Sequence, residues 1–371
     1  MRIIGFCLSC AVAALIVRGA ETKPEIDMAN LKSVTPGDPM IAYMGRVRLV
    51  GDEAVMGYPG ITVRFVYRGP APLLRLTAGS ENCDFNLTCN GWDSVVIHLA
   101  PGKNEIALPL GAAPSGGWLV ELVRRTEAWQ GIASFRGLLL PPGCELLSPP
   151  AWPKRKMLFI GDSITCGEYV ERFPPEYIST PRSTNAARSF GMLLGRWLKA
   201  QVHLVSCGGR GVIRDWTGKT DGINAPQFFQ LTLPDDPEVR WNHASYVPDV
   251  VVVSLGQNDF NKDVPDEAMY TKAYDDFVGQ IRAAYPRAGL VLAEVSLFDD
   301  APGTPDRAKR DLLHRVVQTV AARRRAAGDK RIKDAPVGYY PGTPGNAHLV
   351  AFQHEQVAQE LLGPIQSLTG W

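Results

Sequence analysis

The chain has 371 residues, of which 39 are Lys or Arg and 38 are Asp or Glu, so its formal net charge is +1. Such balance gives no electrostatic reason to bind nucleic acid or an anionic membrane, and we expect neither as a partner. The length exceeds the usual size of one hydrophobic core, which predicts two domains.

Residues 1–20 have the pattern of an export signal. Arg2 is followed by an apolar stretch at 3–17 and by the small-residue region Val17-Arg18-Gly19-Ala20. Fifteen apolar residues are too few to span a bilayer comfortably. We therefore expect a secreted or periplasmic protein that has no membrane attachment after signal removal. Loss of the two arginines leaves 37 basic residues against 38 acidic ones.

Five cysteines follow the signal, an odd number that is too small for a disulfide framework. They lack Cys-x-x-Cys spacing, so neither zinc nor redox chemistry is indicated. We expect single buried thiols, and leave open one bridge between Cys83 and Cys89. The glycosylation sequon Asn86-Leu87-Thr88 lies in an expected strand, and we interpret it as coincidence.

Residues 30–148 predict an all-β domain, a jelly roll or β-sandwich. Short alternating segments are separated by turn residues, and Asn90-Gly91 is typical of a hairpin turn. We expect its tryptophans (Trp92, Trp118, Trp129) to lie mainly in the core. The expected strands are 61–67, 73–76, 85–89, 95–99, 105–108 and 118–124. A Pro-rich linker precedes the second domain.

Residues 152–371 predict an α/β domain with a parallel sheet. Its strands are nearly continuous apolar runs, which indicates that helices cover both sheet faces in a three-layer sandwich. The expected strands are 157–160, 202–206, 250–255 and 290–295, and the expected helices are 189–198, 269–284, 306–327 and 349–362.

Three of these strands end in polar, glycine-rich turns. The turns are Gly161-Asp162-Ser163, then 206–211, then Gly256-Gln257-Asn258-Asp259. Carboxyl ends of parallel strands meet at one edge of a sheet, where ligands bind. Thr165 replaces the second glycine of a Gly-x-Ser-x-Gly elbow, which argues against an ordinary α/β-hydrolase.

A serine hydroxyl needs a base and its oxyanion needs preorganised donors. Ser163 is the candidate nucleophile, and His348, in a loop before the last helix, is the candidate base. The candidate oxyanion donors are the Ser163 and Gly209 N–H groups and the Asn258 amide. Supporting or substrate-binding residues are Asp162, Asn346, Arg214 and Asp259. The other histidines, including His354 on an expected helix surface, have poor metal spacing. We expect no metal and no cofactor.

In this order, Gly161-Asp162-Ser163, Gly209, Gly256-Gln257-Asn258-Asp259 and His348 resemble the four blocks of the SGNH (GDSL-type) hydrolase superfamily. Longer strings at 161–167 and 209–214, and Arg125-Thr126-Glu127-Ala128, resemble carbohydrate esterase family two. The resemblance covers about residues 40–366. It implies an acetyl esterase acting on acetylated xylan or other plant polysaccharide, with a β jelly roll before the SGNH domain.

The sequence departs from that family around the histidine. The usual Asp three residues earlier is Gly345, and Asp-Trp-His-Pro is replaced by Asn346-Ala347-His348-Leu349. Since some members orient the histidine by a main-chain carbonyl, the resemblance leaves a Ser163–His348 dyad plausible. Asn346 is a candidate to bind sugar or histidine, but it carries no charge. Candidates to replace the missing tryptophan as a sugar platform are Tyr339, Tyr340, Trp216 and Phe260.

The leading hypothesis is therefore an exported O-acetyl esterase that works through an acetyl-enzyme on Ser163. Two alternatives stay open from the sequence. One keeps the machinery for another acyl ester, such as a lipid. The other is a carbohydrate-binding protein whose catalysis has decayed, motivated by the missing Asp and Trp. The polysaccharide, the role of the β domain and the oligomeric state are not determined by these patterns.

Overall fold

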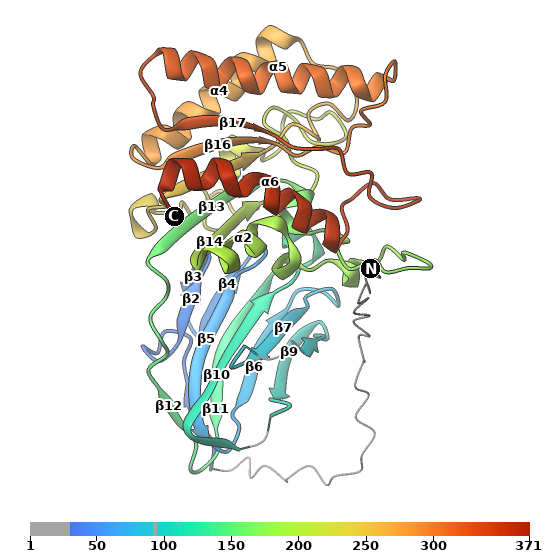
Figure 1. The fold of residues 1–371 in the computed structure, drawn as a ribbon. Helices are drawn as coiled ribbons and strands as arrows, with labels where there is room; N and C mark the ends of the chain where they lie inside the picture. The colour runs from blue at the N-terminus through green and yellow to red at the C-terminus, as the bar shows by residue number, and fades with distance from the viewer. Residues whose placement is uncertain (1–29, 92–94, 111) are drawn as a thin grey trace, which may run out of the picture.

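The computed structural model describes residues 30–91, 95–110 and 112–371. The expected export signal lies outside the described residues. An all-β part comes first in the chain and an α/β part second, and the two are stacked end to end (Figure 1). No helix in the described part of the chain is long and apolar enough to cross a membrane.

Two antiparallel sheets form the β part. The first has the strand order β3-β4-β11-β6-β9, with β1 paired to β11, and the second β12-β5-β10-β7-β8, with β2 paired to β5. Alternate side chains of the central strands, such as Val63, Phe65 and Tyr67, are buried in the core. The strands are β1 (Lys32–Val34), β2 (Ala42–Met44), β3 (Val47–Val50), β4 (Glu53–Met56), β5 (Thr62–Gly69), β6 (Leu73–Ala78), β7 (Phe85–Cys89), β8 (Val95–Ile97), β9 (Gly102–Ala107), β10 (Ala113–Arg124), β11 (Ala133–Leu140) and β12 (Glu145–Leu147).

The tryptophan prediction for this part fails at one position. Trp129 lies in the 3-10 turn η2 (Ala128–Gln130), not in a strand, and is 54% exposed. Trp118 is half-buried against the core, whereas Trp92 lies outside the described residues. Asn90 and Gly91 both have left-handed φ values, 48° and 76°, as a hairpin turn requires.

The sequon and the thiols have simple places in the structure. Asn86 is buried in β7, where its side chain donates to Asn185 and accepts from Arg125. It is not available to carry a glycan, which agrees with the interpretation of the sequon as a coincidence. Cys83 and Cys89 are both free thiols, so the bridge left open between them does not form.

A five-stranded parallel sheet with the order β14-β13-β15-β16-β17 forms the centre of the α/β part. Alternate residues point into two clusters: Leu290 and Leu292 pack with α4 and α5, while Val291 and Ala293 pack with α2 and α6. Helices therefore cover both faces. The elements are β13 (Arg155–Gly161), β14 (Ala200–Ser206), β15 (Val250–Ser254), β16 (Gly289–Glu294), β17 (Ile332–Pro336), α1 (Ser163–Cys166), α2 (Phe190–Leu198), α3 (Ala225–Phe228), α4 (Glu267–Ala284), α5 (Pro305–Ala326) and α6 (Ala351–Thr369).

The last helix differs most from expectation. α6 continues past the predicted end at 362 and through Pro364, because Ile365 and Leu368 still pack on the core. His354, expected on the helix surface, is fully buried: it stacks on Phe190, and its Nδ1 accepts the Phe190 N–H at 3.2 Å. The surface prediction was wrong because α2 covers that face of α6.

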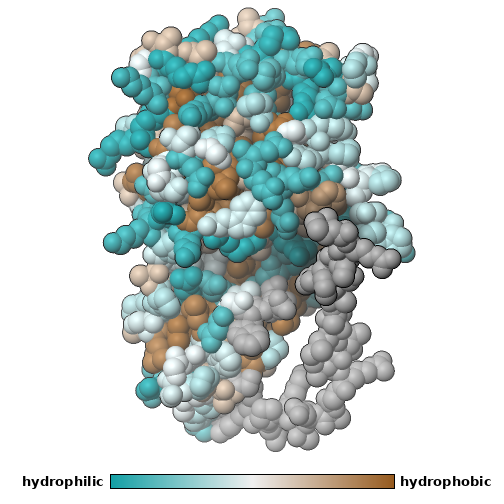
Figure 2. Space-filling model, viewed as in Figure 1, coloured by the Kyte–Doolittle hydropathy of each residue, from teal (hydrophilic) through white to brown (hydrophobic). Residues whose placement is uncertain are grey.

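The two parts are joined by buried polar contacts as well as by apolar packing. Arg46 of the β part donates to the carbonyls of Phe229 and Leu231 at 2.8 and 2.6 Å. Tyr58 donates to the carbonyl of Phe228 at 2.7 Å. The outer end of the α/β part is largely hydrophilic over α5 (Figure 2). The interface is thus closely packed, while the far end is solvated.

Candidate active site

Ser163 is the first residue of α1 and directly follows the N-cap Asp162 at the end of β13. The Asp162 carboxylate accepts the Ile164 N–H at 3.0 Å, which fixes the start of the helix. A Cβ at residue 161 would lie 2.0 Å from the Thr165 hydroxyl, so only glycine allows this close turn. The turn presents the serine at the carboxyl end of the sheet.

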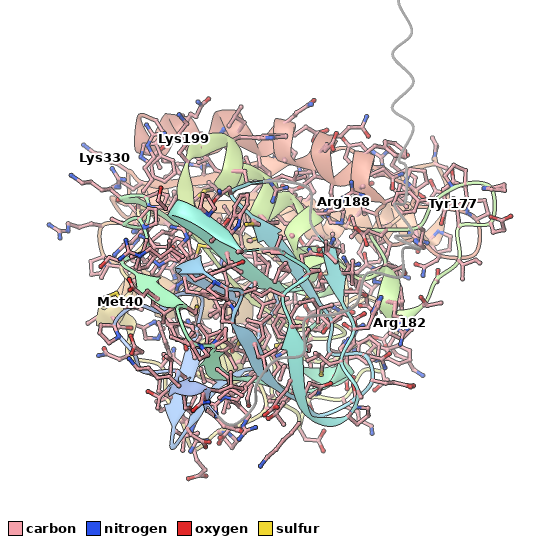
Figure 3. All side chains as sticks on the ribbon, turned by 90° about the horizontal axis from the view of Figure 1, so that it is seen from below. Met40, Tyr177, Arg182, Arg188, Lys199 and Lys330 are labelled. Carbon is pink, nitrogen blue, oxygen red and sulfur yellow. The ribbon has the colours of Figure 1, made fainter. Side chains whose placement is uncertain are left out.

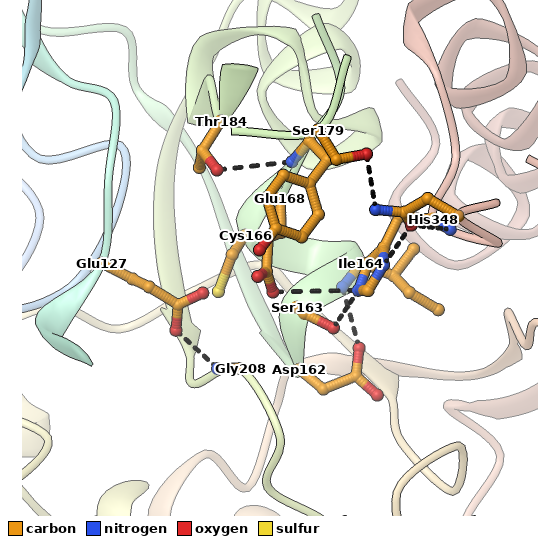
Figure 4. A network of polar contacts seen from close by, with 12 residues as sticks. Glu127, Asp162, Ser163, Ile164, Cys166, Glu168, Ser179, Thr184, Gly208 and His348 are labelled. Carbon is orange, nitrogen blue, oxygen red and sulfur yellow. Dashed lines mark hydrogen bonds and ion pairs between the residues drawn. The ribbon is translucent and has the colours of Figure 1, made fainter. Parts of the chain in front are cut away.

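His348 lies in the loop between β17 and α6 and reaches Ser163. Its Nε2 is 2.9 Å from the Ser163 Oγ (Figure 4). Its Nδ1 is 2.9 Å from the Asn346 Oδ1. The same Oδ1 accepts the His348 backbone N–H at 2.9 Å. Since this amide oxygen can only accept, Nδ1 carries the proton and Nε2 is free to accept from the serine. The histidine partner is therefore the Asn346 side chain, rather than a main-chain carbonyl.

Arg172 holds the histidine loop in place. Its guanidinium donates to the Thr343 hydroxyl at 2.7 Å, to the Asn346 carbonyl at 2.9 Å and to the His348 carbonyl. Burial first, and this cation second, lower the pKa of His348 to about 4. The imidazole is thus neutral at neutral pH, as a general base must be.

Arg172 belongs to the segment 171–188, which follows α1. Tyr177 and Arg182 of this segment lie along one margin of the molecule (Figure 3). Ser179 accepts a hydrogen bond from the Asn346 amide at 2.9 Å, so the segment also contacts the histidine loop from outside. The segment therefore packs against the loop that carries His348.

The candidate oxyanion donors lie on the turns after β13, β14 and β15. Gly209 has φ +73°, and a Cβ there would lie 2.7 Å from the Trp216 ring. Ser163, in the first turn of α1, has an N–H without an intrahelical acceptor. The Asn258 amide donates to the Arg210 carbonyl at 3.0 Å and to Asp162 at 3.2 Å. Its donation to a substrate oxyanion stays a prediction.

Asp259 and Arg214 hold the loops of the site together. The Asp259 carboxylate accepts the N–H groups of Val212 and Ile213 and the Tyr270 hydroxyl. Arg214 donates to the Asp259 carbonyl at 2.7 Å and to the Asp263 carboxylate at 2.6 Å. Burial raises the pKa of Asp259 to about 6. Both residues support the turn that carries Gly209.

Two acidic residues near the site were not among the sequence candidates. Glu127, from the β part, accepts the N–H of Gly208, in the turn at 206–211 that carries the candidate oxyanion donor Gly209. Its signal was the family-like string at 125–128. Glu168 lies 3.7 Å from the His348 Nε2 through its Oε2 and is only 8% exposed (Figure 4). Nothing in the sequence pattern distinguished it.

The four candidate sugar platforms separate clearly. Phe260 is fully buried, and Tyr340 donates to Glu360. Tyr339 lies beside Arg310. Trp216 is 57% exposed and touches the Gly209 turn. Of the four, the position of Trp216 fits a sugar platform best. Across residues 30–91, 95–110 and 112–371, no group of three or more His, Cys, Asp or Glu side chains is arranged to hold a metal ion.

Two family models match different parts of the chain. Residues 43–150 match the carbohydrate esterase 2 N-terminal family, and residues 159–336 match the GDSL-like lipase/acylhydrolase family. An acetylxylan esterase / glucomannan deacetylase of Cellvibrio japonicus is 33% identical over 353 residues, 93% of each chain. The chain belongs to the family two carbohydrate esterases.

Two solved family two carbohydrate esterases have the same fold. One from Cellvibrio japonicus superimposes with a TM-score of 0.83 at 31% identity, covering 92% of this chain and 99% of the other. One from Clostridium thermocellum, in complex with cellohexaose, has a TM-score of 0.80 at 26% identity and covers 89% and 99%. This family two esterase is a carboxylic ester hydrolase, and the resemblance inferred from its motifs is confirmed.

Proposed function

We propose that the protein removes O-acetyl groups from plant polysaccharide of the xylan or glucomannan type, through an acetyl-enzyme on Ser163. The observation that carries this proposal is the 2.9 Å contact between the Ser163 Oγ and the His348 Nε2. The substrate class is supported by the curated relative, named acetylxylan esterase / glucomannan deacetylase.

The geometry supports a two-step mechanism. His348 Nε2 takes the hydroxyl proton as Ser163 attacks the acetyl carbonyl, and the Ser163 and Gly209 N–H groups stabilise the oxyanion. Collapse breaks the bond to the sugar oxygen, which leaves with the proton from His348. Water, deprotonated by the same nitrogen, then attacks the acetyl-enzyme and releases acetate. Each step uses only protein groups and water, so the mechanism needs neither metal nor cofactor.

Loss of catalysis with retention of carbohydrate binding is the weaker hypothesis. It was motivated by the missing acid and tryptophan near His348. The hydrogen-bonded chain from Ser163 through His348 to Asn346 favours a working nucleophile instead. The other alternative is an esterase for a different acyl group. Activity on esters of increasing acyl chain length tests it, because an enzyme with an acetyl-sized pocket should be much less active on butyrate esters than on acetate esters.

The test is acetate release from acetylated xylan, glucomannan and pectin, with wild type compared to Ser163→Ala. We expect wild type to release acetate and the variant to lose at least about 10³-fold in kcat, because no other nucleophile replaces the hydroxyl. Wild-type turnover by the variant contradicts the assignment. Retention of the variant on acetylated xylan separates lost catalysis from lost binding.

We further propose export to the periplasm or the medium, on the pattern of residues 1–20. The balanced charge supports a carbohydrate partner rather than nucleic acid. For the fold, we propose a jelly roll followed by a three-layer sandwich. Two facing antiparallel sheets support the first assignment, and helices on both faces of the parallel sheet support the second.

A further inference from the structure

The proposed mechanism leaves the protonated histidine without an anion at Nδ1. When Nε2 accepts the serine proton, His348 becomes positively charged inside a largely buried site. Asn346, its partner at Nδ1, is neutral, and Gly345 offers no side chain. Arg172 adds a nearby positive charge, which disfavours the imidazolium further. A compensating negative charge has to come from another direction.

Glu168 lies on the side of the His348 ring opposite to Asn346. Its Oε2 lies 3.7 Å from Nε2, the nitrogen that faces the serine. That separation is within ion-pair range but too long for a hydrogen bond, so Glu168 does not compete with the Ser163 hydroxyl for Nε2. The side chain of Glu168 is 10% exposed, and its backbone N–H donates to the Ser163 carbonyl at 3.0 Å, so the residue is held next to Ser163 and His348.

We propose that Glu168 supplies the negative charge that stabilises protonated His348, in place of the acid that other SGNH enzymes carry three residues before the histidine. This inference rests on the proposed function, since it concerns the same base. Glu168 acts through His348 and is a positioning residue for charge, not a nucleophile. Asn346 keeps the separate task of orienting the ring.

The ionisable groups around Glu168 and His348 set the pH range in which Glu168 is negatively charged. Burial first, and then the nearby carboxyls of Glu127 and Asp162, raise the pKa of Glu168 to about 8, with the Tyr169 hydroxyl acting in the opposite direction. Arg172, whose charge lowers the pKa of His348, faces the pair from the His348 side. Glu168 is therefore protonated at neutral pH and releases its proton to solvent as the pH rises through about 8.

We expect the activity to rise with pH because of Glu168. With a pKa of about 4, His348 is already deprotonated throughout the neutral range, so alone it gives a flat profile above about pH 6. Ionised Glu168 raises the basicity of His348 and lowers the energy of the imidazolium. We therefore expect kcat/KM to rise about tenfold between about pH 6.5 and about pH 9.5, since an opposite charge within 4–6 Å shifts a pKa by about 1–3 units.

The experiment compares wild type with Glu168→Gln across this pH range, on an aryl acetate and on acetylated xylan. Support is a flat profile for Glu168→Gln on both substrates, with kcat affected and KM little changed. Adding Asn346→Asp to Glu168→Gln keeps the acceptor at Nδ1 and returns a charge, so it restores most of the lost rate. Glu176→Gln, at an exposed position of the segment 171–188, keeps the wild-type profile.

Three results overturn the inference. The first is an alkaline rise in activity that survives in Glu168→Gln, and the second is a loss of activity confined to xylan, which means that Glu168 contacts the sugar. The third is a loss of activity that is equal at every pH and that Asn346→Asp does not repair. If Glu168→Gln fails to fold, Glu168→Asp is measured instead and must keep the alkaline rise. Failure of the proposed function is distinguishable, because wild type then releases no acetate at any pH.

Discussion

At the residue scale, the His348 imidazole has the neutral Asn346 side chain at Nδ1 and the carboxyl of Glu168 near Nε2. Ser163 and His348 were predictable because glycine-rich turns after parallel strands meet at one edge. The role of Asn346 was not predictable, because the sequence does not show whether its side chain points toward the sugar or toward His348. Glu168 was not predictable at all, because one buried carboxyl has no pattern. The surface prediction for His354 was wrong because its ring stacks on Phe190 of α2, whose N–H it accepts at Nδ1.

Replacing Asn346 tests the orienting role directly. Asn346→Ala removes the acceptor for both the Nδ1 proton and the backbone N–H of His348. The ring then loses its fixed tautomer, and we expect kcat to fall at least about tenfold with KM nearly unchanged. Steady-state kinetics on an aryl acetate measure this. Asn346→Asp, which keeps the acceptor, is the matched control, and a wild-type kcat in Asn346→Ala would show that another group orients the histidine.

At the element scale, long periodic elements were predictable and irregular ones were not. α2, α4 and α5 lie within two residues of their expected bounds. β11, in the middle of the first sheet, was missed because its register shifts between Phe135 and Leu138 and breaks the alternation. β17 was missed because Lys333 and Asp334 interrupt its apolar run at the sheet edge. The sequence did not predict the turn η2, yet this turn places Glu127 against the turn at 206–211.

We expect Glu127 to couple the β part to catalysis through the turn at 206–211. Because its carboxylate accepts the Gly208 N–H, Glu127→Ala frees the loop that presents Gly209. A preorganised oxyanion donor is worth about 3–4 kcal/mol, so partial loss of its alignment lowers kcat about tenfold or more. Glu127→Gln keeps an acceptor and should retain most activity. Glu145→Gln, at an exposed ion pair of the same domain, is the control. Equal kcat in wild type and Glu127→Ala would refute the coupling.

At the scale of the whole molecule, the β part is built into the enzyme. Arg46 is 1% exposed, donates to two carbonyls of the α/β part and lies 5.0 Å from the centre of the Trp241 ring. Such a group is costly to leave without partners, so it ties the two parts together. The change from an all-β part to an α/β part was predictable from the change of hydrophobic period. The interface was not, because its partners are about 180 residues apart.

Arg46→Ala should therefore destabilise the protein by about 3 kcal/mol, since hydrogen bonds to a charged group and apolar packing are lost together. Urea unfolding measures this, and we expect one cooperative transition for both parts. Arg48→Ala, which breaks only the partly exposed ion pair with Asp236, should cost less than about 1 kcal/mol. Equal effects of the two substitutions would mean that Arg46 does not anchor the interface.

The most direct measurement of the central claim is mass spectrometry of the enzyme quenched during turnover of an aryl acetate. We predict one added acetyl group per chain on the peptide that contains Ser163, absent from Ser163→Ala. An acetyl group on a different residue, or turnover with no covalent intermediate on any peptide, would contradict the serine mechanism proposed for this esterase.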